Sequence, residues 1–290
     1  MTKKISFIIF KLIFFVSKFI EKIFGKDLLI YFKEFLEENS YTSKLVCEKK
    51  IIFFTPNFIT KWRVDTFYSK EPETLEWIDS FDDKEKIIFW DIGANIGLYS
   101  IYAALKFEKI DVISFEPSTS NLRILSRNIS NNNLSKKIKI NQLALINKKN
   151  EFLEMQEPEF IEGWAMNSFG KNLDFEGKNF VSKNKYKIYG TSMDYLIENN
   201  ILEIPNYIKI DVDGIEHLIL KGGQSFLKDL KIKSISVELN ENFKEQYEEV
   251  VNIMKISKFQ LKHKKHAVEF DRSVRFSKLY NFVFEKINPN

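Results

Sequence analysis

The chain has 290 residues, of which 44% are hydrophobic and 29% charged, a composition typical of a globular protein and not of a disordered one. This length allows one large domain or two small ones. The formal net charge of +4 is smaller than the basic excess usual in enzymes that bind nucleic acid, so that class gains little support. The single cysteine, Cys47, excludes an intramolecular disulfide framework, and the simplest expectation is a reducing compartment, the cytoplasm.

The N-terminal segment, residues 1–26, differs from everything after it, because its first 24 residues are apolar apart from spaced lysines. On a helix, Lys4, Lys11, Lys18 and Lys22 fall within about 40° of one another. These lysines interrupt the run too early for a membrane-spanning helix of roughly 20 apolar residues, and a signal peptide would have a lysine-free core. We therefore predict an amphipathic helix that lies peripherally at the inner face of a membrane. The alternative is a helix docked on the catalytic domain or on a partner subunit.

Residues 27–84 are expected to form an extension of helices and strands. The pattern predicts a helix from Leu28 to Glu38, strands around Ser43–Phe54 and Trp62–Phe67, and a helix whose first turn contains Pro72. Cys47 lies in the first of these strands, where the alternating pattern favours a small strand side chain over a nucleophile.

Short apolar strands alternate with helices over residues 85–290. Strands are expected at 87–91, 111–116, 138–145, 207–211, 233–238, 258–264 and 279–285, with helices at 120–131, 192–199, 215–226 and 243–256 and another ending at Leu105. Wholly apolar runs are typical of parallel strands that are buried on both faces, whereas the last two strands would form an antiparallel edge. Residues 150–190 break the rhythm and are expected to be a hairpin-rich insertion. We predict an α/β fold, a Rossmann-like, doubly wound and mostly parallel sheet with an N-terminal helical and β extension.

The clearest chemical signal follows the first of these strands and reads Asp91-Ile-Gly93-Ala-Asn95-Ile-Gly97. Glycines let the backbone approach a ligand where a Cβ would collide, and ligands of open α/β sheets bind at the carboxyl ends of the strands. Asp91 can accept hydrogen bonds from a cofactor or help to fix the loop. A dinucleotide loop needs Gly-x-Gly-x-x-Gly around a pyrophosphate, but Asn95 and Leu98 occupy its second and third glycine positions. The turn therefore favours S-adenosylmethionine, with Asp91, Gly93, Asn95 and Gly97 as cofactor contacts.

Glu116 ends the next strand. Its spacing from Asp91 fits one βαβ unit, and a carboxylate at that strand end can accept hydrogen bonds from both ribose hydroxyls of a cofactor. We therefore expect Glu116 to bind the ribose.

Two acids and a glycine, Asp211, Asp213 and Gly214, follow the fourth strand, without the twelve-residue ligand spacing of a calcium loop. We expect Asp211, and Glu238 at the end of the fifth strand, to face the acceptor as a general base, or together with Asp213 to bind a divalent metal such as Mg²⁺. Asp211 is also expected to contact the cofactor. For Asp213 the alternative is a tight turn that caps the following helix. His217 could polarise the acceptor, although a lone helical histidine is more often structural.

Several motifs occur in an order that resembles the FkbM family of methyltransferases. They are Glu71-Pro-Glu-Thr, Asp91-Ile-Gly-Ala-Asn-Ile-Gly, Phe115-Glu-Pro, Asn128, Ile210-Asp-Val-Asp-Gly-Ile-Glu and Ser236-Val-Glu-Leu. The resemblance covers about residues 65–285 and implies a class I methyltransferase fold that binds S-adenosylmethionine. The resemblance also implies that Glu73 and Ala144 contact the cofactor. The family's usual Asp-Val-Glu-Gly is Asp211-Val-Asp213-Gly here, which keeps the charge on a shorter side chain.

The resemblance also implies O-methylation of a hydroxyl, often on a sugar, so the expected acceptor is a sugar, glycan, glycolipid or other small molecule and not a nucleic acid. Hydroxyl attack needs in-line placement and removal of a proton, which Asp211 or Glu238 can assist. The alternative is a nucleic-acid methyltransferase, but the Asn-Pro-Pro-aromatic turn of base N-methylation is absent, and Cys47 lies outside any cytosine C5 motif. A third alternative is a membrane-associated binding module without catalysis, against which the intact acids at three strand ends argue.

Overall fold

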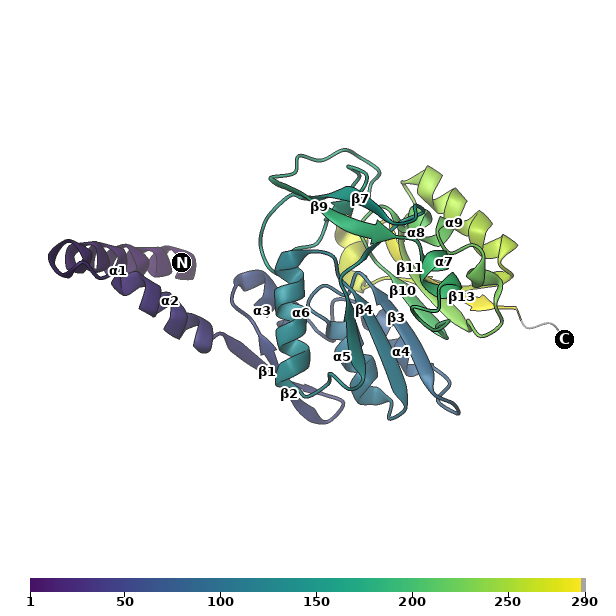
Figure 1. Ribbon diagram of the computed structural model, residues 1–290, viewed down its shortest axis with the longest axis horizontal. Helices are drawn as coiled ribbons and strands as arrows, with labels where there is room; N and C mark the ends of the chain where they lie inside the picture. Colours follow the sequence, from purple (N-terminus) through teal and green to yellow (C-terminus); the bar gives the residue numbers. More distant parts are fainter. Residues whose placement is uncertain (288–290) are drawn as a thin grey trace.

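A seven-stranded sheet forms the centre of the body, in the order β12-β13-β11-β10-β3-β4-β5 (Figure 1). Neighbouring strands from β11 to β5 are parallel, whereas β13 is antiparallel to both β11 and β12. The strands are β3 (Ile87–Ile92), β4 (Ile110–Phe115), β5 (Ile138–Asn141), β10 (Tyr207–Ile210), β11 (Ser234–Asn240), β12 (Phe259–Lys265) and β13 (Leu279–Lys286). The computed structural model describes residues 1–287. This mostly parallel sheet confirms the predicted fold class.

Helices cover both faces of the sheet, as expected for a doubly wound fold. Alternate residues of β3 enter two cores: Phe89 packs on the face covered by α4, α5 and α6, and Trp90 on the face covered by α7, α8 and α9. These helices are α4 (Pro72–Asp79), α5 (Leu98–Lys106), α6 (Thr119–Asn131), α7 (Met193–Glu198), α8 (Glu216–Lys221) and α9 (Lys244–Ile256). The helix predicted for residues 215–226 ends at Lys221, because two glycines follow it.

The extension contains the antiparallel strands β1 (Tyr41–Val46) and β2 (Lys49–Phe54) and the helix α3 (Phe58–Asp65). The strand predicted for Trp62–Phe67 is wrong, since most of this segment belongs to α3. Asn57 caps that helix: its side chain accepts a hydrogen bond from the backbone N–H of Thr60, whose hydroxyl accepts one from the backbone N–H of Asn57. This capping box starts a helix just before the segment for which the residue pattern predicts a strand.

The predicted insertion forms a second, four-stranded sheet in the order β6-β9-β7-β8, with β7 antiparallel to β8 and β9. Its strands are β6 (Ala144–Leu145), β7 (Glu151–Glu157), β8 (Ser168–Phe169) and β9 (Asn184–Thr191). The single strand predicted at 138–145 is therefore divided between the two sheets. The chain turns where the Asn141 side chain accepts a hydrogen bond from Leu143 N.

Two helices, α1 (Thr2–Phe24) and α2 (Leu28–Glu38), form an arm that projects from the body (Figure 1). Gly25 ends α1 in a left-handed conformation, and Asp27 caps α2 by accepting a hydrogen bond from Leu29 N. Among residues 1–287, no helix combines the length and the apolar character that crossing a bilayer requires.

Candidate active site

The loop after β3 lies against the ends of β4 and β10. Gly93 and Gly97 have left-handed backbone conformations, with φ of 85° and 88°, and the backbone N–H groups of Gly93 and Ala94 donate to the carbonyl oxygen of Phe115, both at 3.0 Å. A Cβ on Gly93 would lie 1.8 Å from the carbonyl oxygen of Asp211. Only glycine fits there.

Asp91 lies beneath this loop and is fully buried. Its Oδ2 accepts a hydrogen bond from Ser100 Oγ of α5 at 2.5 Å, and Ser100 Oγ also bonds to Ser114 Oγ of β4 at 2.7 Å. Burial raises the pKa of Asp91. These hydrogen bonds fix α5 to the sheet, whereas Asp91 Oδ1 is buried and has no hydrogen-bond partner among residues 1–287.

Glu116 lies at the end of β4, as the sequence predicts for a ribose-binding acid. Its Oε2 accepts a hydrogen bond from Asn95 N at 2.7 Å, and its Oε1 one from Ser118 N at 2.8 Å. Each oxygen keeps a lone pair for another donor. Burial raises the pKa of Glu116 to about 7. Glu116 lines a small cavity together with Asn95, Asn121 and Asp211.

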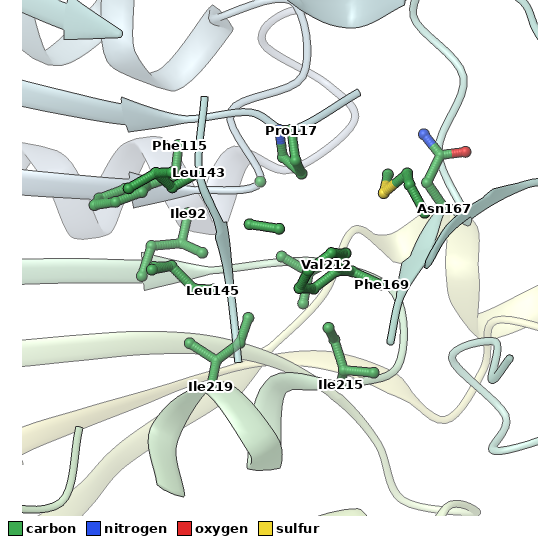
Figure 2. A pocket seen from close by; sticks show the side chains of 13 residues that line it. Ile92, Phe115, Pro117, Leu143, Leu145, Asn167, Phe169, Val212, Ile215 and Ile219 are labelled. Atoms are coloured by element: carbon green, nitrogen blue, oxygen red, sulfur yellow. The ribbon is translucent and has the colours of Figure 1, made fainter. Parts of the chain in front are cut away.

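An apolar pocket adjoins the Glu116 cavity, and Figure 2 shows its side chains around one narrow space. Pro117 and Leu143 approach from the ends of β4 and β5, and Val212 from the loop after β10. Ala144 also lines this pocket, so the structure places it beside the predicted cofactor loop. A narrow space with such walls suits a flat uncharged ring, and a carboxylate beside it suits a sugar diol. The pair therefore fits a nucleoside such as that of S-adenosylmethionine.

Three carboxylates converge next to this cavity. One oxygen each of Glu71, Asp211 and Glu238 lies within 4.8 Å of the others. Glu71 is the N-cap residue of α4, Asp211 directly follows β10, and Glu238 lies in β11. We call these three residues the acid cluster. Lys70 pairs with Glu71, and Lys209 Nζ donates to Asp211 Oδ2 at 2.7 Å. Glu71 Oε2 is buried and has no hydrogen-bond partner in the part of the chain that the structure describes.

The surroundings shift the pKa values of Glu71 and Glu238, two acids of the cluster, in opposite directions. Burial raises the pKa of Glu238 well above its usual value, and the charges of Asp211 and Glu71 raise it further. Burial also opposes ionisation of Glu71, but the charges of Lys70 and Lys209 outweigh it and hold the Glu71 pKa below its usual value. An ionised carboxylate beside a protonated one can accept a proton and pass it on.

A segment of the insertion, residues 161–167, crosses the crevice above the sheet, and we call it the crevice loop. Trp164 O accepts hydrogen bonds from Asn95 Nδ2 at 3.0 Å and from Asn121 Nδ2 at 3.1 Å. Asn121 Oδ1 accepts one from Gly163 N at 2.8 Å. The cofactor loop and the start of α6 therefore hold the crevice loop in place.

Asp213 also binds the crevice loop, because its Oδ2 accepts a hydrogen bond from Met166 N at 2.7 Å. Asp213 has a left-handed backbone with φ of 62°, the conformation of a tight turn. Burial, and then the charge of Asp211, raise its pKa to about 6. Asp213 lies outside the group of three acids that could share a metal ion. The tight turn expected as the alternative role of Asp213 is therefore present, but Asp213 does not cap α8, whose N-cap residue is Ile215.

A larger cavity opens on the other side of the crevice loop, with an empty volume of about 1250 Å³ including the part open to solvent. Asp211, Asp213 and Glu238 lie among its lining residues, as do Arg63 and Lys70. Aromatic rings form much of the remaining wall, namely Phe58, Trp62, Trp164, Phe270 and Phe276. We call this space the acceptor cavity.

Glu73, predicted to contact the cofactor, and His217, predicted to polarise the acceptor, line neither the Glu116 cavity, nor the apolar pocket, nor the acceptor cavity. Glu73 is buried on α4, where its Oε1 accepts a hydrogen bond from Asn281 Nδ2 of β13 at 2.9 Å. His217 on α8 lies against the ring of Phe243, and burial lowers its pKa. Glu71, which sequence reasoning noted only as part of a motif, takes part in the acid cluster instead. The sequence feature that could have indicated Glu71 is its position directly before Pro72, the first residue of α4.

Comparison with known proteins agrees with this geometry. The family model for the methyltransferase FkbM domain matches residues 91–264. Methyltransferase sdnD from Sordaria araneosa is 27% identical over an alignment of 151 residues, and the match covers 46% of this chain and 58% of that protein. The chain thus spans little more than half the length of this relative.

Solved structures with a similar fold include an FkbM methyltransferase from Methylobacillus flagellatus, with 17% identity and a TM-score of 0.47 over 78% of this chain and 52% of that chain. Another is M. capricolum TrmK with S-adenosylhomocysteine, with 12% identity and a TM-score of 0.42 over 73% of this chain and 67% of that chain. Because the family model alone spans more than half of the sequence, the chain belongs to the FkbM methyltransferase family.

Proposed function

We propose that the protein transfers a methyl group from S-adenosylmethionine to a hydroxyl of a sugar, in a glycan or glycolipid. The observation that carries the proposal is the position of Asp211, which lines both the Glu116 cavity and the acceptor cavity. Gly93 and Asn95 also line both. Asp211 therefore lies where the cofactor side and the acceptor side meet.

Each part of the cofactor has residues that suit it. Glu116 would accept hydrogen bonds from the ribose hydroxyls, and the apolar pocket of Pro117, Leu143 and Val212 would hold the adenine. When bound, S-adenosylmethionine supplies an electrophilic methyl group on a sulfonium centre. Glycine at position 93 lets the cofactor loop pack directly against the backbone of Asp211, because a side chain there would collide with it.

The acid cluster would prepare the acceptor hydroxyl. Asp211 accepts its hydrogen bond and takes its proton as the oxygen becomes the nucleophile, while Lys209 orients the carboxylate from below. Glu238 lines the acceptor cavity together with Asp211, and Glu71 adjoins both within the acid cluster. The crevice loop would exclude water from the space between the two cavities.

The chemistry of the acceptor cavity supports a sugar. Aromatic rings such as those of Trp62, Phe270 and Phe276 offer apolar faces, against which the C–H face of a pyranose can pack. Carboxylates at the other side of the cavity accept hydrogen bonds from hydroxyls. This combination favours a polyhydroxylated acceptor over an apolar one.

A divalent cation at the acid cluster is the second way to activate the hydroxyl, because three carboxylate oxygens converge there. Lys70 and Lys209 already compensate much of the negative charge, so we favour direct proton transfer to a carboxylate. Turnover that is lost with a chelator and restored by Mg²⁺ would assign the acids to a metal ion.

The test uses S-adenosylmethionine labelled in its methyl group and a panel of oligosaccharides, glycolipids, nucleic acids and proteins. We expect label on a sugar oxygen, identified by mass spectrometry. Asp211→Asn should lower turnover by ~10²–10⁴-fold and leave S-adenosylhomocysteine binding within a few-fold. Asp83→Asn, at an exposed acid of the body, is the control. Label on a nucleic acid or protein, or normal turnover in Asp211→Asn, would overturn the proposal.

A further inference from the structure

Exposed large apolar side chains are much denser along the arm formed by α1 and α2 than along the body. On α1, Ile8, Leu12, Phe15 and Phe19 are 58–71% exposed. With Ile5, Ile9, Val16 and Ile23, which are also exposed, they occupy an arc of roughly 120° on one side of the helix. A patch of this kind on a soluble surface marks an interaction site.

The two helices of the arm are fastened to each other on a different side. Ser17 is buried, and its hydroxyl donates to Asp27 Oδ1 at 3.0 Å and accepts from Leu29 N at 2.9 Å. Asp27 and Leu29 belong to the turn and the first residues of α2. The pairing with α2 therefore leaves the apolar arc of α1 uncovered.

The base of the arm is attached to the body through charged groups. Glu37 Oε1 of α2 accepts hydrogen bonds from Arg127 at 2.9 Å and from Arg123 at 2.7 Å, both on α6. In Figure 1, α1 projects beyond this attachment and away from the sheet. The apolar arc thus faces away from packing partners within residues 1–287.

A line of positive charge borders the apolar arc. Lys4, Lys11, Lys18 and Lys22 follow one side of α1, and Glu21 is the one acid of this helix. Lys11 and Lys18 lie over the rings of Phe7 and Phe14. Long cationic side chains beside a wide apolar face match a lipid interface, where the stem lies in the acyl boundary and the ammonium group reaches the headgroups.

We propose that α1 lies in the interface of a membrane that contains anionic lipids, with the arc of Ile8, Leu12, Phe15 and Phe19 buried among the acyl chains and α2 packed on a different side of α1. A second copy of the chain is the less suitable occupant, because a coiled-coil seam is narrower than this arc and prefers aliphatic residues over phenylalanine. Anionic lipid headgroups also pair with the lysines, for which the α1 of a second copy offers a single acid, Glu21.

Co-sedimentation of the full-length protein with vesicles tests the proposal. We expect binding to vesicles of phosphatidylcholine mixed with phosphatidylglycerol, and much weaker binding to phosphatidylcholine alone. High salt should weaken the binding without abolishing it, because salt screens the lysines and leaves the apolar contribution.

Two variants separate the contributions of charge and apolar surface. One replaces the line of lysines by alanine at Lys4, Lys11, Lys18 and Lys22, and should weaken binding to the mixed vesicles at least about tenfold. Its control carries alanine at four exposed lysines of the body, Lys84, Lys136, Lys187 and Lys228. The other replaces the arc by serine at Ile8, Leu12, Phe15 and Phe19, and should weaken binding at least about 100-fold. Its control carries serine at exposed apolar positions of the body, Val181, Ile201, Leu230 and Ile256.

Both controls should bind vesicles as the wild type does, and all four variants should keep its unfolding temperature. Sedimentation equilibrium without lipid tests the competing possibility that the arc binds a second copy of the chain. The proposal is overturned if full-length protein stays in the supernatant with every vesicle. A concentration-dependent dimer that the serine variant of the arc dissociates, without vesicle binding by the wild type, would assign the arc to a second copy of the chain.

Discussion

The backbone of Gly93 touches the backbone of Asp211 so closely that a Cβ on Gly93 would lie 1.8 Å from the Asp211 carbonyl oxygen. The cofactor loop after β3 and the acid-bearing loop after β10 are thus packed as one unit. A shift of either loop would move the candidate base relative to the cofactor site. This contact explains why the glycine motif and the acid motif occur together in the chain.

Gly93→Ala should abolish S-adenosylhomocysteine binding and lower the free energy of unfolding by about 2–4 kcal/mol, through left-handed strain and overlap with Asp211. Gly25→Ala is the matched control, because Gly25 is also left-handed, with φ of 65°, but a Cβ added to it would meet no heavy atom within 4 Å. Strain alone should lower its unfolding free energy by about 1 kcal/mol. Calorimetry and thermal unfolding measure both effects, and equal behaviour of the two variants would contradict the contact.

Cofactor affinity should depend on pH through Glu116. Because burial raises its pKa to about 7, the carboxyl group is largely protonated at lower pH and then accepts fewer hydrogen bonds from the ribose hydroxyls. Affinity for S-adenosylhomocysteine should therefore rise as the pH increases through 7. Glu116→Gln cannot ionise, so it should bind more weakly and lose this dependence. Titrations at a series of pH values decide the matter, and a wild-type affinity that falls with rising pH would refute the role.

The central sheet could be predicted because its signals are local. The runs that form β3, β4, β10 and β11 are short and apolar, and each is followed by a helix or an acid-containing turn. The helix α3 could not be predicted from the sequence, because Trp62–Phe67 is rich in residues that favour strands. The interaction that decides the local structure there is the capping box of Asn57 and Thr60, whose sequence also suits a simple turn.

The site could be predicted where a residue ends a strand, as Asp211, Glu116 and Glu238 do. The role of Glu71 could not be predicted from the sequence, because its place in the acid cluster depends on how α4 packs against β10 and β11. Glu73 lies two residues further along the same helix, but its carboxylate accepts a hydrogen bond from Asn281 instead. No local pattern distinguishes these two acids, and only their tertiary contacts do.

A matched pair of substitutions tests that distinction. Glu71→Gln should lower methyl transfer by about 10–100-fold, because it removes one charge of the acid cluster and leaves Lys70 without its counter-ion. Glu73→Gln should keep turnover near the wild-type value, since it lies against β13. Steady-state kinetics measures both, with S-adenosylhomocysteine binding as the check that each variant is folded. Loss of turnover in Glu73→Gln alone would reverse the assignment.

The crevice loop should open more readily when its anchor is removed. Asn121→Ala deletes the hydrogen bonds to Gly163 N and Trp164 O, and each is worth about 1 kcal/mol. Hydrogen exchange of residues 161–167 should therefore become roughly 30-fold faster. Asn132→Ala is the control, because Asn132 lies at the other end of α6 and bonds to Ile52. Unchanged exchange in Asn121→Ala would show that other contacts hold the loop.

Calorimetry with S-adenosylhomocysteine and with NAD tests the central claim most directly. We expect one S-adenosylhomocysteine site per chain, no tight NAD binding, and a loss of about 1–3 kcal/mol in binding free energy for Glu116→Ala. Tight binding of NAD without binding of S-adenosylhomocysteine, or an S-adenosylhomocysteine affinity that Glu116→Ala leaves unchanged, would contradict the claim.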